Sequence, residues 1–359
     1  MNFGMNSGAV SANPFVAPGM IKDPRLFVGR KEELNAIASR MSGVQPTSIN
    51  IVGEKHIGKS SLLYHFSRTW EQRVTDPSRY VVIYLSLRDA NCETEMGFYE
   101  VVAEALLNRL ALWKLQLRNP LQVQPLNRQV FSDAIKKWKK QDVLPVLCLD
   151  DFQILLERPQ EFDNNFYNSL RSLMDDSALM LVVASRKKLG TYAAEKGLTS
   201  PFFNVGQTLV LRELTTDEAI QLTRFPDNTG ASALSVNEQN YAQQWGKRHP
   251  YKLQLACRCL WEARHQGKDI QWAKEQFLQE INQSQSSSNH PWLKWQWLRW
   301  IVWDFPIRLG RVAKFIGGNV DDVTNWIIGF VILILLIFVV MGLVNWEQVK
   351  GVLQKAVGG

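Results

Sequence analysis

Short apolar runs alternate with longer amphipathic stretches along most of this chain. Five of these runs consist mainly of strand-forming residues, at positions 48–52, 80–85, 143–149, 179–186 and 207–211. Runs that are apolar at nearly every position suit strands covered on both faces, and the stretches between them are compatible with helices. The pattern therefore predicts an α/β fold, a doubly wound five-stranded parallel sheet flanked by helices.

A glycine-containing loop follows the first predicted strand. Residues 53–61 read G-E-K-H-I-G-K-S-S, and an apolar helix-compatible run comes directly after them. Backbone N–H groups of such a loop, together with the N-terminus of the next helix, bind phosphate groups. The predicted nucleotide-binding residues here are Gly53, Ile57, Gly58, Lys59, Ser60 and Ser61. Lys59 would contact the β and γ phosphates of ATP, and Ser60 would bind Mg²⁺; the alternative is a structural glycine turn with an incidental lysine.

The third predicted strand ends in two carboxylates, Asp150 and Asp151. An apolar strand ending in acidic residues is the Walker B pattern that accompanies a phosphate loop. Asp150 is the predicted second Mg²⁺ ligand, and Asp151 is the predicted catalytic group that polarises the attacking water. The alternative for this pair is an acidic cap on a following helix.

The fourth predicted strand ends in a serine and an arginine. Residues at the carboxyl ends of parallel strands face the ligand crevice, so Arg186 is a candidate sensor of the γ phosphate with a catalytic role. Its alternative is a surface arginine in a basic turn with Lys187 and Lys188.

Motifs outside the sheet resemble those of the STAND-class ATPases, in the AAA+-like group of P-loop NTPases. Residues 27–34 read F-V-G-R-K-E-E-L, similar to the box that contacts adenine in that group, which implies that Phe27, Val28 and Arg30 bind the nucleotide. Residues 200–204 and 245–254 also resemble family segments. In the family the second of these places a proline over adenine, and this maps onto Pro250 with His249 beside it.

The resemblance covers residues 23–281 and implies an ATPase core at 23–212 and a helical lid at 213–281. Residues 1–22, rich in small and polar residues, are predicted to be a disordered tail that is not a signal peptide. After residue 281 we find neither a winged helix nor a repeat period, although relatives usually carry both. Autoinhibition by the family's usual route is therefore not expected, and the trigger is expected to come from a partner.

The C-terminal part of the sequence predicts a membrane anchor. Residues 327–345 form an almost entirely apolar segment between Trp326 and Trp346. Its uninterrupted apolar part, residues 327–344, corresponds to roughly 27 Å of helix, close to the hydrocarbon thickness of a bilayer. The ATPase would lie in the cytoplasm, since the flanking Arg and Lys residues are more numerous on its side. The alternative is a buried core helix. A short tail, 346–359, would follow the span.

Residues 282–326 are predicted to join lid and span through a flexible polar linker and a tryptophan-rich segment at the lipid headgroups. The net charge of +7 suits an anionic membrane or a nucleic acid without choosing between them. A basic run at 136–140 is expected to be a solvated helix face rather than a DNA contact. The four cysteines have no spacing typical of a disulfide framework or a metal cluster.

Together these features favour a membrane-anchored ATPase that uses ATP and Mg²⁺ as an oligomerisation switch with slow hydrolysis. The resemblance implies a homo-oligomer acting in signalling or antiviral defence. The alternative is a tethered, ATP-dependent DNA-binding assembly factor similar to origin-recognition or transposition-regulator ATPases. A third possibility is a scaffold that binds nucleotide and scarcely hydrolyses it.

Overall fold

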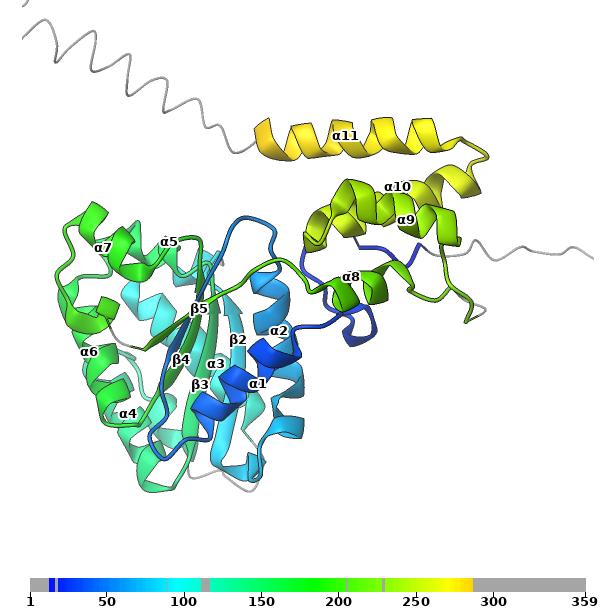
Figure 1. Cartoon of the computed structure of the whole chain (residues 1–359). Coiled ribbons are helices and arrows are strands. Elements are labelled where there is room, and N and C mark those ends of the chain that lie inside the picture. Colours follow the sequence, from blue (N-terminus) through cyan, green and yellow to red (C-terminus); the bar gives the residue numbers. More distant parts are fainter. Residues whose placement is uncertain are drawn as a thin grey trace, which may run out of the picture. The chain divides into compact units, whose positions relative to one another are not determined.

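The computed structural model describes residues 13–16, 19–88, 90–110, 117–204, 206–227 and 230–286. Five strands form one parallel sheet, and helices precede, separate and follow them (Figure 1). The strands are β1 (Ile49–Val52), β2 (Tyr80–Ser86), β3 (Leu144–Asp150), β4 (Met180–Ser185) and β5 (Gln207–Val210). Each predicted strand is therefore present, with bounds that differ from the prediction by one or two residues.

The α-helices fall into those of the core, which alternate with the strands, and those that follow β5. The core helices are α1 (Lys31–Met41), α2 (Lys59–Thr69), α3 (Glu95–Arg109), α4 (Arg128–Lys140), α5 (Gln153–Leu156), α6 (Asn164–Asp175) and α7 (Leu189–Lys196). The later helices are α8 (Thr216–Thr223), α9 (Val236–Gly246), α10 (Pro250–His265) and α11 (Ile270–Ser286).

The strand order is β2-β3-β4-β1-β5, so β1 lies between β4 and β5. All pairs are parallel: Val52 of β1 is in register with Ser185 of β4, and Ser86 of β2 with Asp150 of β3. The carboxyl ends of the strands therefore meet at one edge of the sheet. The loop after β1 and the carboxylates after β3 reach that edge together.

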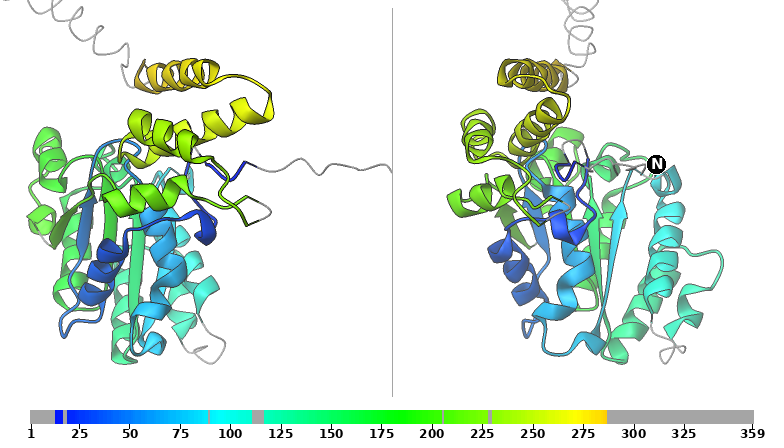
Figure 2. Two further views of the ribbon diagram at one scale, coloured as in Figure 1. Left: turned by 45° about the vertical axis from the view of Figure 1, so that its right-hand side comes forward. Right: turned by 90° about the vertical axis from the view of Figure 1, so that its right-hand side faces the viewer.

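Helices cover both faces of the sheet, as Figures 1 and 2 show. Alternate residues of one strand enter different hydrophobic clusters: Leu147 and Leu149 of β3 pack with α3, α4 and α6, whereas Val146 and Cys148 pack with α1 and α2. This arrangement explains why the central strands read as continuous apolar runs. β5 differs, because it is an edge strand and Val210 is 52% exposed.

The lid helices begin at residues whose side chains cap them. Thr215 and Ser235 form capping boxes with Glu218 and Glu238 at the starts of α8 and α9. His249 caps α10, which has Pro250 as its first residue. These caps define a helical subdomain after β5, in the region where the sequence predicts the lid.

Within the predicted tail, the structure describes residues 13–16 and 19–22, and some of these contact the core and the lid. Phe15 is 3% exposed and stacks on Phe225, while the N–H of Ile21 donates to Ser61 Oγ at 3.0 Å. Phe15 is thus packed against a lid residue, and the backbone of Ile21 is hydrogen-bonded to a side chain of α2. Composition alone did not show these partners, which are far away in the sequence.

Two compact units divide the chain, residues 1–278 and 279–359, and within the second the structure describes only the end of α11. The predicted span at 327–345, the tryptophan-rich segment and the tail after it lie outside the described residues, as does all but the start of the 282–326 linker. Among the helices that are described, none has the length and apolar character needed to cross a membrane.

Candidate functional site

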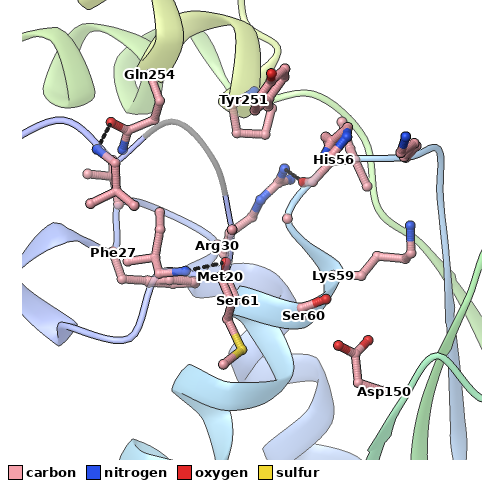
Figure 3. A pocket seen from close by; sticks show the side chains of 18 of the residues that line it. Met20, Phe27, Arg30, His56, Lys59, Ser60, Ser61, Asp150, Tyr251 and Gln254 are labelled. Carbon is pink, nitrogen blue, oxygen red and sulfur yellow. Dashed lines mark hydrogen bonds between the residues drawn. The ribbon is translucent and has the colours of Figure 1, made fainter. Parts of the chain in front are cut away.

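A cavity of about 310 Å³ opens where the carboxyl edge of the sheet meets α10 and the N-terminal segment (Figure 3). Its lining includes every predicted site residue except Gly53 and His249. The predicted residues that line it are Phe27, Val28, Arg30, Ile57, Gly58, Lys59, Ser60, Ser61, Asp150, Asp151, Arg186 and Pro250. Residues from the loop, three strand ends and the lid therefore converge on one cavity.

The loop between β1 and α2 has the backbone conformation that its glycines permit. Gly58 has φ +100° and precedes the first residue of α2, and His56 also has a positive φ, +64°. A side chain at Gly53 would lie 2.9 Å from the carbonyl oxygen of Leu211, so glycine is required there for close packing on the chain after β5. Gly53 thus shapes the loop without lining the cavity.

Lys59 Nζ donates to the carbonyl oxygens of Gly53 and Glu54, at 2.7 Å each. Burial lowers the pKa of Lys59, and the nearby Asp150 and Asp151 oppose this shift. The ammonium group is therefore held over the loop by two carbonyl oxygens. An anionic ligand in the loop would compete with these oxygens for the N–H groups of Lys59.

Asp150 is a buried carboxylate, 5% exposed, at the end of β3. Burial raises its pKa, while hydrogen bonds from Ser60 and Tyr84 oppose the shift; the Tyr84 hydroxyl donates to Oδ2 at 3.1 Å. Hydroxyl and carboxylate oxygens so arranged beside a phosphate loop are a donor set suited to Mg²⁺. The structure thus joins the two residues that the sequence predicts as metal ligands, and it adds Tyr84, which the sequence analysis missed.

Asp151 adopts a left-handed backbone conformation, φ +56°, which turns its carboxylate towards Arg88. Arg88 Nε donates to Oδ2 at 2.5 Å, and Gln153 Nε2 donates to Oδ1 at 2.9 Å. Burial alone would raise the pKa of Asp151, but these hydrogen bonds outweigh it and the net shift is downward. The predicted catalytic carboxylate is therefore engaged by Arg88, a residue that belongs to no motif in the sequence.

Arg186 is exposed and lies directly after Ser185, whose hydroxyl donates to Asn50 Oδ1 at 3.0 Å. This buried pair links β4 to β1 and fixes the strand end that carries Arg186. Arg186 lines the same cavity as Lys59 and Asp151. The position agrees with the predicted approach to the γ phosphate; the alternative of a surface turn fits Lys187, which pairs with Glu195.

Arg30 lines the cavity, and its side chain also has hydrogen-bond partners within the protein. Its guanidinium group is buried and donates to the carbonyl oxygens of Ile57 at 3.2 Å and Arg212 at 2.7 Å. Arg30 therefore ties the start of α1 to the phosphate loop and to the connection between β5 and the lid. The apolar residues of the box, Phe27 and Val28, also lie at the cavity wall, and Phe27 stacks on His65 with ring centroids 4.0 Å apart.

His249 does not line the cavity, unlike its neighbour Pro250. Its Nδ1 accepts from the N–H of Lys252 at 3.4 Å, and its Nε2 lies 3.6 Å from Glu54 of the phosphate loop. Burial lowers its pKa more than Glu54 raises it. The role of His249 in the fold is to cap α10 and to contact the loop, whereas Tyr251 and Gln254 of the same helix line the cavity.

The basic run at 136–140 lies on α4, and Trp138 within it is completely buried. Its indole Nε1 donates to the carbonyl oxygen of Leu117 at 2.9 Å, while Lys136 pairs with Asp176. The tryptophan is therefore a core residue and is not available for stacking on a nucleic-acid base.

Comparisons with known proteins agree with this geometry. The family profile described as "Bacterial TniB protein" matches residues 30–196, which include the phosphate loop and both carboxylates. A search of curated proteins gives no match. Solved structures with a similar fold include a Walker-type ATPase of Pyrococcus abyssi, with 15% identity, 82% of each chain covered and a TM-score of 0.52.

The ORC2 protein of Aeropyrum pernix, in its ADPNP and ADP complexes, is 14% identical, with a TM-score of 0.50 over 73% of this chain and 72% of that one. At such identities the likeness concerns the fold. Together with the loop, the strand-end carboxylates and the strand order, it shows a P-loop NTPase fold for the five-stranded core.

Proposed function

We propose that this domain binds ATP with Mg²⁺ in the cavity of Figure 3 and hydrolyses it slowly. The observation that carries the proposal is the convergence of Lys59, the side chains of Ser60 and Asp150, and the N-terminus of α2 at one end of the cavity. A cation, a metal-binding oxygen pair and a positive helix end together form a site for a polyphosphate and its metal ion.

Each residue has a task that follows from its position. Lys59 would exchange its two carbonyl partners for phosphate oxygens. Ser60 and Asp150 would hold Mg²⁺, which would neutralise phosphate charge. Asp151 accepts a proton from the attacking water once its carboxylate is released from Arg88. Arg186 stabilises negative charge on the transferred phosphate.

Contacts between the phosphate loop and the lid suggest how occupancy acts on the rest of the protein. His56 stacks on Tyr251 with centroids 4.6 Å apart, and Glu54 lies beside His249. When the loop rearranges around phosphate, these contacts change. The affinity of the protein for the nucleotide therefore differs from one lid position to another. Such a difference is what a ligand needs to shift a conformational equilibrium. We therefore propose that ATP sets the lid position and thereby controls self-association.

The oligomeric state of the full chain tests this switch. It is to be measured without nucleotide, with ADP and with a non-hydrolysable ATP analogue, for the wild type and Lys59→Ala. A defined oligomer is expected only for the wild type with the analogue. The same mass in all conditions would contradict nucleotide-driven assembly, while a binding titration with ATP would show separately whether the site works.

Membrane anchoring remains part of the proposal, on the basis of the apolar segment at 327–345. Clustering of anchored copies would suit a role in signalling or antiviral defence, and the ATPase domain would face the cytoplasm. Flotation of the full chain with lipid vesicles, compared with a chain lacking residues 327–345, measures the anchoring directly. Equal flotation of the two would overturn it.

A second candidate is an ATP-dependent assembly factor on DNA. The fold likeness to the ORC2 protein of Aeropyrum pernix supports it, and the net charge of +7 is compatible with a nucleic-acid partner. DNA binding that requires ATP and weakens steeply as salt rises would support this candidate. Absence of binding at low salt, with ATP present, would remove it.

A further inference from the structure

A buried side-chain amide with an unused donor lines the cavity. Gln254 on α10 is 2% exposed, and its Oε1 accepts from the N–H of Val16 at 3.2 Å. Its Nε2 has no hydrogen-bond partner among the described residues. Buried N–H groups nearly always have a partner, so this donor at the cavity wall is available to an acceptor on a bound ligand.

The orientation of this amide is determined by Val16. A backbone N–H is only a donor, so the amide must present its oxygen to Val16, and a flipped amide would place two donors against each other. Nε2 is therefore fixed as a donor, and the group that it recognises must be an acceptor.

The position of Gln254 assigns this acceptor to the base end of the nucleotide. In Figure 3, Gln254 and Phe27 lie on the side of the cavity away from Lys59 and Asp150. If the phosphates bind at Lys59, the nucleoside lies on the side of Gln254 and Phe27. Pro250 and Gln254, four residues apart, lie on the same face of α10, and both line the cavity.

We propose that Gln254 is a specificity-determining residue, which donates from Nε2 to a ring nitrogen of the adenine base. Adenine offers three such acceptors, N1, N3 and N7. The backbone N–H of Val16 holds the amide in the orientation needed for this contact. The N-terminal segment therefore contributes to base selection indirectly, through Gln254. This inference rests on the proposed ATP binding and specifies which residue reads the base.

A cycle of ligand and protein changes tests it. Affinities of the full chain for ATP and for 1-deaza-, 3-deaza- and 7-deaza-ATP are measured by titration calorimetry, for the wild type and for Gln254→Met. In the wild type, one deaza analogue is expected to bind about 3- to 10-fold more weakly than ATP, the usual effect of one hydrogen bond. In Gln254→Met the same analogue should bind as well as ATP, because the donor is gone.

Gln243→Met is the matched control, since this lid glutamine donates to Thr223 and does not line the cavity. It should retain the wild-type pattern. If all three analogues bind the wild type as tightly as ATP, or if the penalty persists in Gln254→Met, the inference is wrong. If Gln254→Met does not fold, the wild-type affinities still show whether a ring nitrogen is recognised. Gln254→Asn then replaces Gln254→Met as the variant. Failure of the wild type to bind ATP would instead overturn the proposed function.

Discussion

Arg88 Nε and Asp151 Oδ2 form an ion pair at 2.5 Å, although the residues are 63 positions apart in the sequence. Arg88 follows β2 and Asp151 follows β3, and these strands are neighbours in the sheet. The pair therefore forms across the carboxyl edge, next to the predicted phosphate site. The ion pair engages the carboxylate that we propose as the acceptor of the proton from the attacking water.

Arg88→Ala is expected to increase the rate of ATP hydrolysis, by about tenfold, because the carboxylate no longer has a charged hydrogen-bond donor to give up before it contacts water. ATP affinity should change little. Steady-state phosphate release measures the rate. Arg79→Ala is the matched control, since Arg79 makes a similar ion pair, with Asp142, at the opposite end of β2. A fall in rate for Arg88→Ala alone would mean that Arg88 itself stabilises the transition state.

Asp151→Asn should reduce hydrolysis by about 10²- to 10⁴-fold, the usual contribution of a positioned general base. The amide keeps the shape of the carboxylate but cannot take the proton. ATP binding should remain, because Lys59, Ser60 and Asp150 are unchanged. Single-turnover hydrolysis and a binding titration separate the two effects. Unchanged hydrolysis would show that another group activates the water, or that the protein is a scaffold with only background activity.

Gly29→Ala is expected to destabilise the fold by about 2–4 kcal/mol. Gly29 has φ +69°, and a Cβ there would lie 2.2 Å from Glu218 Oε1, an oxygen that accepts from the N–H of Arg30 at 2.6 Å. Glu218 would have to move, which breaks this contact between core and lid. Chemical denaturation measures the loss.

Gly267→Ala is the comparison for this change, because Gly267 has a similar φ, +64°, with open space where the Cβ would be. It should cost only about 1 kcal/mol, the backbone penalty alone. Equal losses at the two positions would show that the Glu218 contact contributes nothing to stability.

Stability is expected to decrease as the pH falls from 7 towards 5.5. Burial lowers the pKa of both His65 and His249 from the ordinary value of 6.5. The unfolded chain then binds more protons than the folded one, so this stability is complete above pH 6.5 and is lost as the pH falls through 6.5 towards the lower pKa of the folded state. Urea midpoints across this range measure the effect.

His249→Asn should make the dependence shallower, because asparagine also caps a helix but does not titrate. If this variant kept the whole dependence, His249 would not contribute to it.

Much of the site follows from local sequence patterns, because a phosphate loop is a contiguous segment between a strand and a helix. The apolar runs ending in Asp150 and Ser185 predict strands whose carboxyl ends meet, and the structure confirms five parallel strands. The carboxylates could be assigned because parallel packing brings all such ends to one edge.

The sequence by itself thus determined the type of fold, the phosphate loop and the two strand-end carboxylates, since each depends on residues close together in the chain. Only the tertiary structure decided which groups meet them from elsewhere. Arg88 contacts Asp151 from the neighbouring strand end, and Arg30 joins the loop to the connection between β5 and the lid. Gln254 contacts Val16, 238 positions away. No local pattern encodes such contacts, because they depend on how the lid and the N-terminal segment pack on the sheet.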